Sequence, residues 1–162
     1  MISSIQTFLA VWQQEADATV SVFEKLTDES LSKQLVDGYR SIERLANHIV
    51  DCAAGIPQEA TVPLQHEKQH HTTVNDLIAA YKDATDKVKQ AVTGWTDDTL
   101  QEDTPMYGRS WKKGFALWVT IAHQAHHRGQ LTVLMRLAGL KVPGVYGPAK
   151  EEWEAMGLPN AD

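Results

Sequence analysis

The chain has 162 residues, of which 43% are hydrophobic, and this length and composition fit one domain over residues 1–162 with a single sizeable core. Its formal net charge is −6 and its lysines and arginines are scattered, so no basic face is available for a phosphate backbone and we expect no nucleic-acid partner. The longest apolar runs fall far short of the ~20 residues that a membrane span needs, and the N-terminal stretch has no basic region or cleavage site, so we expect a cytoplasmic protein that does not bind membranes.

Four segments place apolar residues at the spacing of an amphipathic helix. The first follows a serine cap and has Phe8 and Trp12 on its apolar stripe. The last contains no proline, is apolar over most of its circumference and ends at Gly139, so we expect it to be buried among the others. The four helices are predicted at residues 3–26, 41–55, 73–94 and 112–139.

Polar segments join these helices. Residues 27–40, with one helical turn, and residues 95–110 are predicted connectors, and residues 56–72 are a predicted surface loop because they hold two prolines and no periodic pattern. A short C-terminal helix is expected to begin at Pro148 and to end before Gly157. No segment shows strand-like alternation. The pattern therefore predicts an all-α protein, a four-helix bundle with long connectors and a short C-terminal helix, and leaves the topology open.

The last long helix carries histidines at positions 123, 126 and 127. His123 and His127 are four residues apart, which places both imidazoles on one face about one turn from each other, close enough to share a cation. His126 faces another direction. Burying an imidazole without a partner is costly, so the pair needs either hydrogen-bond partners or a shared metal. The spacing alone leaves both interpretations open.

His48 and Cys52 lie one turn apart on the inward row of the second helix. An isolated histidine on an apolar row is more often structural than a ligand, and a buried cysteine is more often a small hydrophobe than a soft ligand. Because the chain has one cysteine, an internal disulfide and a cysteine-rich zinc site are excluded, and a metal site has to rely on His, Asp or Glu. The histidines of the loop, His66, His70 and His71, are expected to be solvated.

The chain also carries three motifs in order: RLANHIVD in the second helix, HQAHHRGQLTVLMRLAG in the fourth, and VPGVYGPAKEEW in the tail. Together they resemble the DinB-like superfamily of small bacterial four-helix metalloproteins, over nearly the whole chain. The most specific part is the run HxxxHRGQ. The resemblance implies a three-histidine metal site with the ligands His48, His123 and His127. It also implies a homodimer packed through the bundle helices.

A three-histidine site has a definite chemistry. Neutral imidazoles leave a divalent ion its full charge and an open position for water or substrate. Such a centre lowers the pKa of bound water to about 7 or holds a thiol as its thiolate, and nitrogen ligation suits zinc, nickel, iron or copper, of which we expect zinc or nickel. The resemblance implies a metal-dependent thiol S-transferase that joins a low-molecular-weight thiol to a small electrophile. The alternatives are a metal-dependent hydrolase and a non-catalytic, stress-associated metal-binding bundle.

Polar residues near the ligands have two interpretations each. Some of them lie within one helical turn of a ligand: Asn47, Asp51, Thr120 and Gln130. Each of these either orients an imidazole or forms a local hydrogen bond. Arg44 and Arg128 either contact an anionic substrate or thiol, or form an ion pair with an acidic residue of a neighbouring helix. No catalytic residue beyond the ligands is identified.

Overall fold

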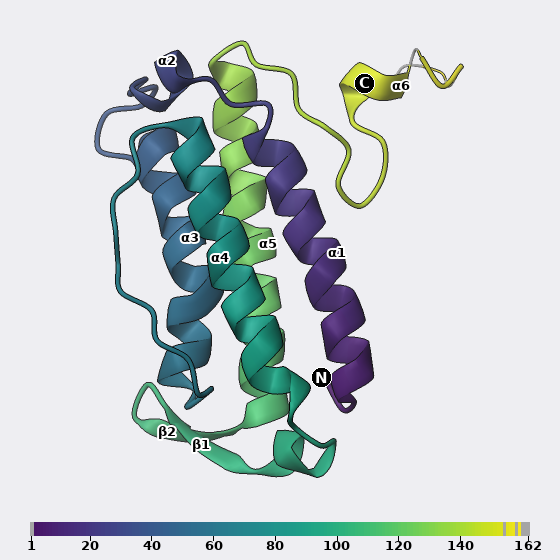
Figure 1. Ribbon diagram of the computed structural model, residues 1–162. Coiled ribbons are helices and arrows are strands. Elements are labelled where there is room, and N and C mark those ends of the chain that lie inside the picture. Colours follow the sequence, from purple (N-terminus) through teal and green to yellow (C-terminus); the bar gives the residue numbers. More distant parts are fainter. Residues whose placement is uncertain (1, 154, 158, 160–162) are drawn as a thin grey trace.

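The computed structural model describes residues 2–153, 155–157 and 159, and Figure 1 shows four long helices side by side. These helices are α1 Ile5–Phe23, α3 Ile42–Glu59, α4 Val74–Thr93 and α5 Lys113–Leu137. The shorter elements are α2 Asp28–Leu31, the 3₁₀-helix η1 Asp98–Gln101, the strands β1 Asp103–Met106 and β2 Arg109–Lys112, and α6 Lys150–Trp153. The predicted helical bundle with a short C-terminal helix is confirmed. None of the helices in these described ranges is long and apolar enough to cross a membrane.

The long helices follow an up, down, down, up order, so that α3 and α4 are parallel (Figure 1). α3 packs against α4 and α5, and α1 packs against the same two helices. Because α3 and α4 are parallel, residues 60–73 have to run back along the bundle before α4 begins. A connector of this length can span up to about 46 Å, which exceeds the roughly 27 Å length of α3. The long loop is therefore a crossover connection.

Two buried hydrogen bonds fix the helices relative to one another. The indole N–H of Trp12, on α1, donates to the backbone carbonyl of Thr85 on α4 at 3.1 Å. The hydroxyl of Tyr81, on α4, donates to Oε1 of Gln124 on α5 at 2.6 Å. Around them each large apolar side chain contributes about 1.5–3 kcal/mol through burial. The fully buried ones include Phe8, Phe23, Leu45, Ile49, Leu77 and Leu131.

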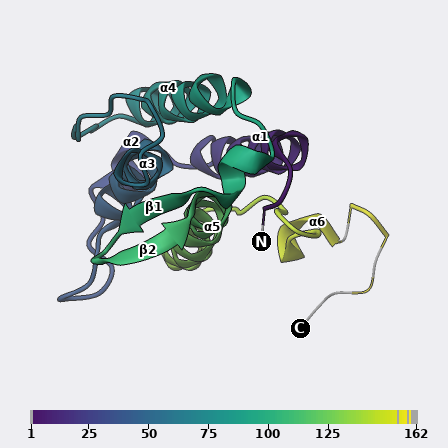
Figure 2. The same cartoon turned by 90° about the horizontal axis from the view of Figure 1, so that it is seen from below.

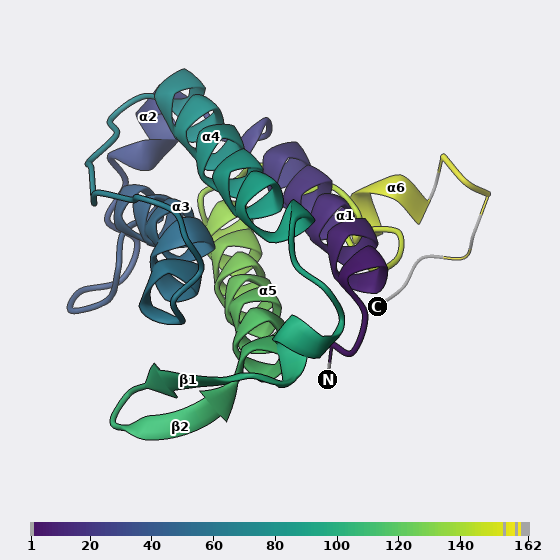
Figure 3. The same ribbon diagram turned by 60° about the horizontal axis from the view of Figure 1, so that its bottom comes forward.

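The connector predicted at residues 95–110 contains a β-hairpin, so the expectation that no strand occurs is wrong for this segment. Its turn residues Tyr107 and Gly108 have φ angles of +49° and +74°, as a two-residue type I′ turn requires. Each strand has four residues, and only Thr104 and Met106 are buried, so the alternation is too short to be visible in the sequence. The hairpin lies across the end of the bundle beneath α3 and α5 (Figures 2 and 3).

α3 continues about one turn beyond its predicted end near Gly55. The helix includes Pro57 and ends at Glu59. A proline in the last turn lacks only the hydrogen bond to the carbonyl four residues earlier, and its ring restricts the turn that precedes it. Ile56 and Met106 of the hairpin belong to one buried cluster. This packing offsets the lost hydrogen bond, which explains why the proline does not end the helix.

Candidate metal centre

α5 carries two of the three predicted ligands on the face that meets α3. The spacing of four residues places His123 and His127 on one row, and α3 is the helix that packs most closely against this row. His127 is 7% exposed and His123 is half-buried. His126 is exposed, as the sequence predicted for a residue one position out of register. His48 projects from α3 to meet the pair.

The three predicted ligands converge at their nitrogen atoms. Nε2 of His127 lies 3.0 Å from Nε2 of His48 and 3.1 Å from Nε2 of His123. The ring plane of His127 crosses those of His48 and His123 at 79° and 78°. Donor atoms around one tetrahedral ion with bonds of 2.0–2.1 Å lie roughly 3.3 Å apart. The two separations from Nε2 of His127 are therefore close to what a single ion requires.

Gln130 sets the orientation of His127. Oε1 of Gln130 lies 2.8 Å from Nδ1 of His127, and its amide nitrogen lies 3.0 Å from Nε2 of His126. Because an amide oxygen only accepts hydrogen bonds, Nδ1 of His127 carries the proton and its Nε2 keeps a lone pair directed at the other two rings. Ligand histidines in metal sites are oriented in this way. Of the two interpretations of Gln130, the orienting role is the one the contacts support.

Burial keeps the three imidazoles neutral. Desolvation lowers the pKa of His48 from its ordinary value of 6.5 to about 4, and the positive charge of Arg40 adds a smaller effect in the same direction. Desolvation also lowers the pKa of His123 and of His127, although the hydrogen bond from Gln130 opposes the shift at His127. Neutral imidazole is the form that binds metals. At neutral pH, no proton has to leave these rings before an ion enters.

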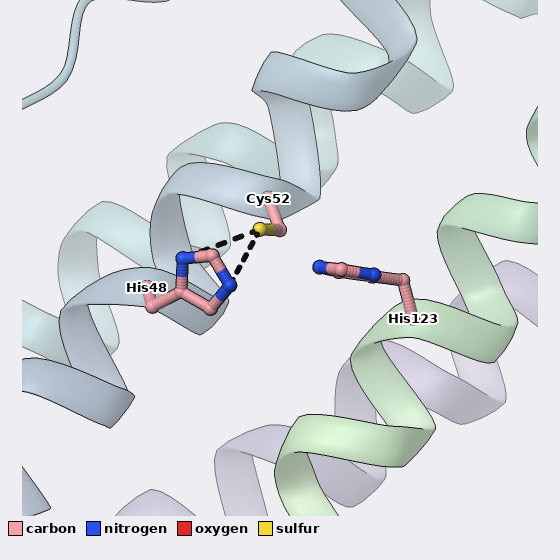
Figure 4. Close-up of side chains that lie close together, drawn as sticks. All are labelled: His48, Cys52 and His123. Atoms are coloured by element: carbon pink, nitrogen blue, oxygen red, sulfur yellow. Dashed lines mark hydrogen bonds between the residues drawn. The ribbon is translucent and has the colours of Figure 1, made fainter. Parts of the chain in front are cut away.

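Cys52 places a fourth donor atom beside the imidazoles. Its Sγ lies 3.5 Å from Nε2 of His48, and His48, Cys52 and His123 offer donor atoms that lie within 4.8 Å of one another. In Figure 4 the ring of His123 points from α5 toward these two side chains of α3. Burial, and then the charge of Asp51, raises the pKa of the thiol to about 11. The sulfur is therefore protonated at neutral pH, as for the buried core residue that the sequence predicted.

Comparison with known proteins supplies the family. A model of the DinB family matches residues 1–161. The chain belongs to the DinB family. It is 41% identical over 162 residues to a Bacillus subtilis (strain 168) protein described as "Uncharacterized protein YrdA", a match that covers 98% of this chain and 97% of the other.

Solved structures agree with this assignment. A DinB-like protein from Bacillus cereus ATCC 10987 has a TM-score of 0.85 at 35% identity, and the match covers 90% of this chain and 100% of that one. The DinB-like protein YjoA from Bacillus subtilis has a TM-score of 0.68 at 22% identity over 86% of this chain and 96% of the other, which shows the shared fold. The resemblance inferred from the three sequence motifs is confirmed.

The donor set of this DinB-family chain fits a divalent transition metal. Imidazole nitrogens with a thiol nearby suit zinc, nickel, iron or copper, and do not suit calcium or magnesium. Within the described residues, the side-chain hydrogen bonds of the three imidazoles go to one another, to Cys52 and to Gln130. No carboxylate or backbone carbonyl in that part of the chain binds their ring nitrogens. Carboxylates and backbone carbonyls, the common partners of structural histidines, are therefore not bound to these rings there.

The other residues predicted near the ligands have local roles. Asn47 exchanges hydrogen bonds of 2.8 and 2.7 Å with the backbone of His71 and so ties the crossover connection to α3. Thr120 donates to a carbonyl of its own helix. Asp51 forms an ion pair with Lys68 at 3.1 Å. No hydrogen bond joins any of the three to an imidazole of the cluster within the described ranges.

The prediction that the loop histidines are solvated is wrong for His66. Its side chain is 14% exposed, and its Nε2 lies 3.6 Å from Oδ1 of Asp51. The reason is the crossover connection, whose residues Val62 and Leu64 are buried in the core and draw the segment against α3. The loop composition could not show this, because only these two apolar residues anchor it.

Arg128, which follows His127 in the sequence, faces α1 and lies away from the histidines. It is 1% exposed. Its Nη2 donates to Oε2 of Glu15 at 2.5 Å and to the Tyr146 hydroxyl at 2.6 Å, and its Nη1 donates to Oγ1 of Thr19 at 2.9 Å. The ion-pair interpretation therefore holds for Arg128. Sequence reasoning missed Glu15 and Tyr146, because they lie 113 and 18 positions away and belong to no motif with it.

Two cavities adjoin the histidines. The first, which we call the basic groove, has a volume of about 370 Å³ and reaches His48. Its lining includes the charged residues Arg40, Arg44, Asp51 and Lys68. The second, which we call the apolar groove, has a volume of about 600 Å³ and reaches His127. Its lining includes Tyr39, Arg40, Leu45, Gln130, Val133 and Leu134.

Proposed function

We propose that this DinB-family protein binds a divalent transition metal, zinc or nickel, through His48, His123 and His127, and transfers a low-molecular-weight thiol to a small electrophile at that ion. The observation that carries the proposal is the approach of two Nε2 atoms to Nε2 of His127, at 3.0 and 3.1 Å, from two different helices. Nitrogen atoms that face one another at these distances need either an N–H donor in each gap or a cation that they share.

The residues of the chain have distinct roles in this proposal. His48, His123 and His127 bind as neutral ligands, so the ion would keep its full positive charge and act as a Lewis acid that favours the thiolate form of a thiol. Gln130 holds the proton on Nδ1 of His127 and keeps its Nε2 free to bind. The two grooves, which share Arg40 in their linings, give small molecules access to His127 and to His48.

Transfer of a thiol needs two molecules at one centre. The thiol loses its proton to solvent, its sulfur forms a bond to an electrophilic carbon of the second molecule, and the leaving group departs with the bonding electron pair. Access through two grooves suits such a two-substrate reaction. Hydrolysis would use a general base near the attacking water. Within the described residues no carboxylate contacts the three imidazoles, and Asp51, which lines the basic groove, is paired with Lys68, which makes the hydrolase alternative weaker.

A non-catalytic metal site is the second candidate, and Cys52 favours it. A thiolate added to three imidazoles would complete a closed tetrahedral site of the structural type. The distance of 3.5 Å from Sγ to Nε2 of His48 places the thiol near such a position. The raised pKa of the thiol opposes this role at neutral pH, because the sulfur has to lose its proton first.

The test starts with protein purified without a histidine tag, stripped with a chelator and titrated with zinc and with nickel. We expect one ion per chain. We expect His48→Ala and His127→Ala each to raise the dissociation constant at least about 100-fold, because the loss of a ligand weakens metal binding more than the loss of a residue that only orients a ligand. His126→Ala, one residue from a ligand and exposed, is the matched control: it removes only a hydrogen bond to Gln130 and should change the constant by less than about tenfold. Equal affinity in all four proteins would overturn the proposed site.

The reaction is tested separately from binding. The zinc-loaded and nickel-loaded proteins are assayed for the conjugation of 2-mercaptoethanol and of cysteine with 1-chloro-2,4-dinitrobenzene. We expect turnover that disappears on chelation and in His127→Ala but persists in His126→Ala. If the metal binds at the histidines and raises the melting temperature, yet a panel of thiols and electrophiles shows no turnover, the non-catalytic candidate replaces the transferase.

A further inference from the structure

The basic groove stands out in an acidic protein. The chain carries a formal net charge of −6, yet three cationic side chains and one carboxylate line this groove, an excess of two positive charges with histidines neutral. The carboxylate belongs to Asp51, whose Oδ2 lies 3.1 Å from Nζ of Lys68. The excess charge therefore resides on the two arginines of the groove, Arg40 and Arg44.

These two arginines, like Arg109 of the hairpin, have no carboxylate partner among the described residues, and these two also line a groove that reaches His48. Arg128 and Arg136 each form an ion pair, with Glu15 and Glu151. Within residues 2–153, 155–157 and 159, no carboxylate lies within 4.0 Å of the guanidinium of Arg40 or Arg44. The acidic residue beside them in the sequence, Glu43, instead lies 2.6 Å from Nε2 of His70. Both guanidinium groups are exposed and free to bind an anion.

Arg40 and Arg44 lie next to the histidine cluster. Arg44 lies one turn before His48 on α3, and Arg40 lies just before the start of that helix. Arg40 lines both the basic groove, which reaches His48, and the apolar groove, which reaches His127. An anion held between Arg40 and Arg44 would lie beside the convergent nitrogen atoms.

We propose that the basic groove is a carboxylate subsite, in which Arg40 and Arg44 bind a carboxylate of the small thiol whose sulfur lies at the histidines. The inference rests on the proposed function for the thiol and extends it to the charge of that substrate. A guanidinium binds a carboxylate through two parallel hydrogen bonds, which gives both affinity and orientation. A carboxylate bound at one end of the thiol would aim the sulfur at the metal centre and reduce the number of orientations it has to search.

The test compares two thiols that differ in charge. Cobalt-loaded protein is titrated with mercaptosuccinate and with 2-mercaptoethanol, and binding is followed through the thiolate-to-cobalt charge-transfer absorption. Charge-assisted hydrogen bonds predict that the wild type binds mercaptosuccinate at least about tenfold more tightly. In the double variant Arg40→Gln/Arg44→Gln the preference should fall to within about twofold. It should also shrink in the wild type as ionic strength rises.

Arg109→Gln is the matched control, because Arg109 is an exposed arginine of the hairpin at the opposite end of the bundle (Figure 1). It should keep the full preference. Chelation of the cobalt by a carboxylate could also favour mercaptosuccinate, but that gain would persist in Arg40→Gln/Arg44→Gln. A preference that the double variant retains therefore overturns the inference. All three positions are exposed, so the variants are expected to fold, and thermal unfolding checks this.

The outcomes separate this inference from the proposed function. If cobalt binds but the two thiols bind equally in the wild type, the subsite is absent and the metal site stands. If no metal binds, the proposed function fails, and the groove is tested in the metal-free protein by amide chemical-shift changes on addition of succinate. Shifts centred on residues 40–48 that are lost in the double variant would support a carboxylate subsite, and their absence would exclude it.

Discussion

His127 and Arg128 are neighbours on α5, yet they belong to two polar clusters of opposite design. The Arg128 cluster is saturated, because its guanidinium meets both the carboxylate and the backbone carbonyl of Glu15 and the hydroxyls of Thr19 and Tyr146. The histidine cluster is unsaturated, because its convergent Nε2 atoms meet one another. His127 and Arg128 are both buried, at 7% and 1% exposed, so exposure does not distinguish the two residues.

The difference arises from the helix that faces each residue. α1 presents the carboxylate of Glu15 to Arg128, and the charge is neutralised inside the protein. α3 presents the imidazole of His48 to His127, with the thiol of Cys52 beside His48, and neither side chain supplies a counter-charge. A saturated cluster needs no ligand and contributes to the fold. A cluster whose nitrogen atoms meet one another, with no counter-charge beside them, can exchange those hydrogen bonds for a shared cation, as a metal-binding site does.

The largest effect is expected when the counter-charge in the saturated cluster is removed. Glu15→Ala leaves the guanidinium of Arg128 buried without its carboxylate, and we expect the free energy of unfolding to fall by about 3–5 kcal/mol. Denaturant unfolding measures this. The zinc affinity of the folded protein should not change, because the cluster lies on the α1 side of α5. Asp86→Ala, at an exposed position of α4, is the control and should change stability by less than about 0.5 kcal/mol. If Glu15→Ala is as stable as the wild type, the carboxylate partner of Arg128 does not contribute to the stability of the fold.

A smaller effect is expected when the single outside support of the histidine cluster is removed. Gln130→Leu keeps the size of the side chain but removes the acceptor for Nδ1 of His127. We expect zinc affinity to fall about 10- to 100-fold, measured by competition with a chromophoric chelator, while the stability of the metal-free protein changes little because Gln130 is exposed. Gln130→Glu retains an acceptor and should retain the affinity. Equal affinities in all three proteins would show that the ring needs no such support.

The fold was largely predictable, and its errors have local causes. Helical periodicity and end signals located α1, α3, α4 and α5, because amphipathic helices of this length leave a repeated pattern. The hairpin was missed because four-residue strands carry only two buried positions, Thr104 and Met106. The extension of α3 past Pro57 was missed because it depends on packing against the hairpin, a contact between segments far apart in sequence.

The candidate site was predictable only in part. Spacing placed His123 and His127 on one face, but it could not choose between a metal and structural partners. His48 joined them through the family resemblance, since nothing local distinguishes a ligand from a core histidine. The unpaired state of Arg40 and the pairing of Arg128 with Glu15 were beyond sequence reasoning, because each depends on which side chain a different segment brings near. The homodimer, the cytoplasmic location and the single-domain organisation stay predictions.

Acid reveals the contribution of the histidine cluster to stability without a mutation. In the metal-free protein the pKa of His48 is lowered from 6.5 to about 4, and those of His123 and His127 are lowered as well. Between those two pH values the unfolded chain binds more protons than the folded one, so the free energy of unfolding is greatest above pH 6.5 and declines as the pH falls toward 4. Urea midpoints measured across this range on chelator-treated protein should show the decline, and His48→Asn should make it shallower. If the urea midpoint depends on pH in the same way in the wild type and in His48→Asn, the loss of stability in acid does not come from the buried neutral imidazoles.

The smallest effect is expected at Cys52, and it decides how far the histidine cluster is from saturation. The pKa of the thiol is raised to about 11, so its deprotonation at pH 7 costs about 5 kcal/mol and offsets much of what a sulfur ligand would add. We therefore expect Cys52→Ala to change zinc affinity at pH 7 by less than about tenfold. We also expect the cobalt-loaded wild type to show no thiolate-to-cobalt charge-transfer absorption until a thiol is added. A loss of more than about 100-fold, together with that absorption in the absence of added thiol, would make Cys52 a fourth ligand. The histidine cluster would then be closed like the Arg128 cluster, and the open position that thiol transfer requires would be filled by the protein itself.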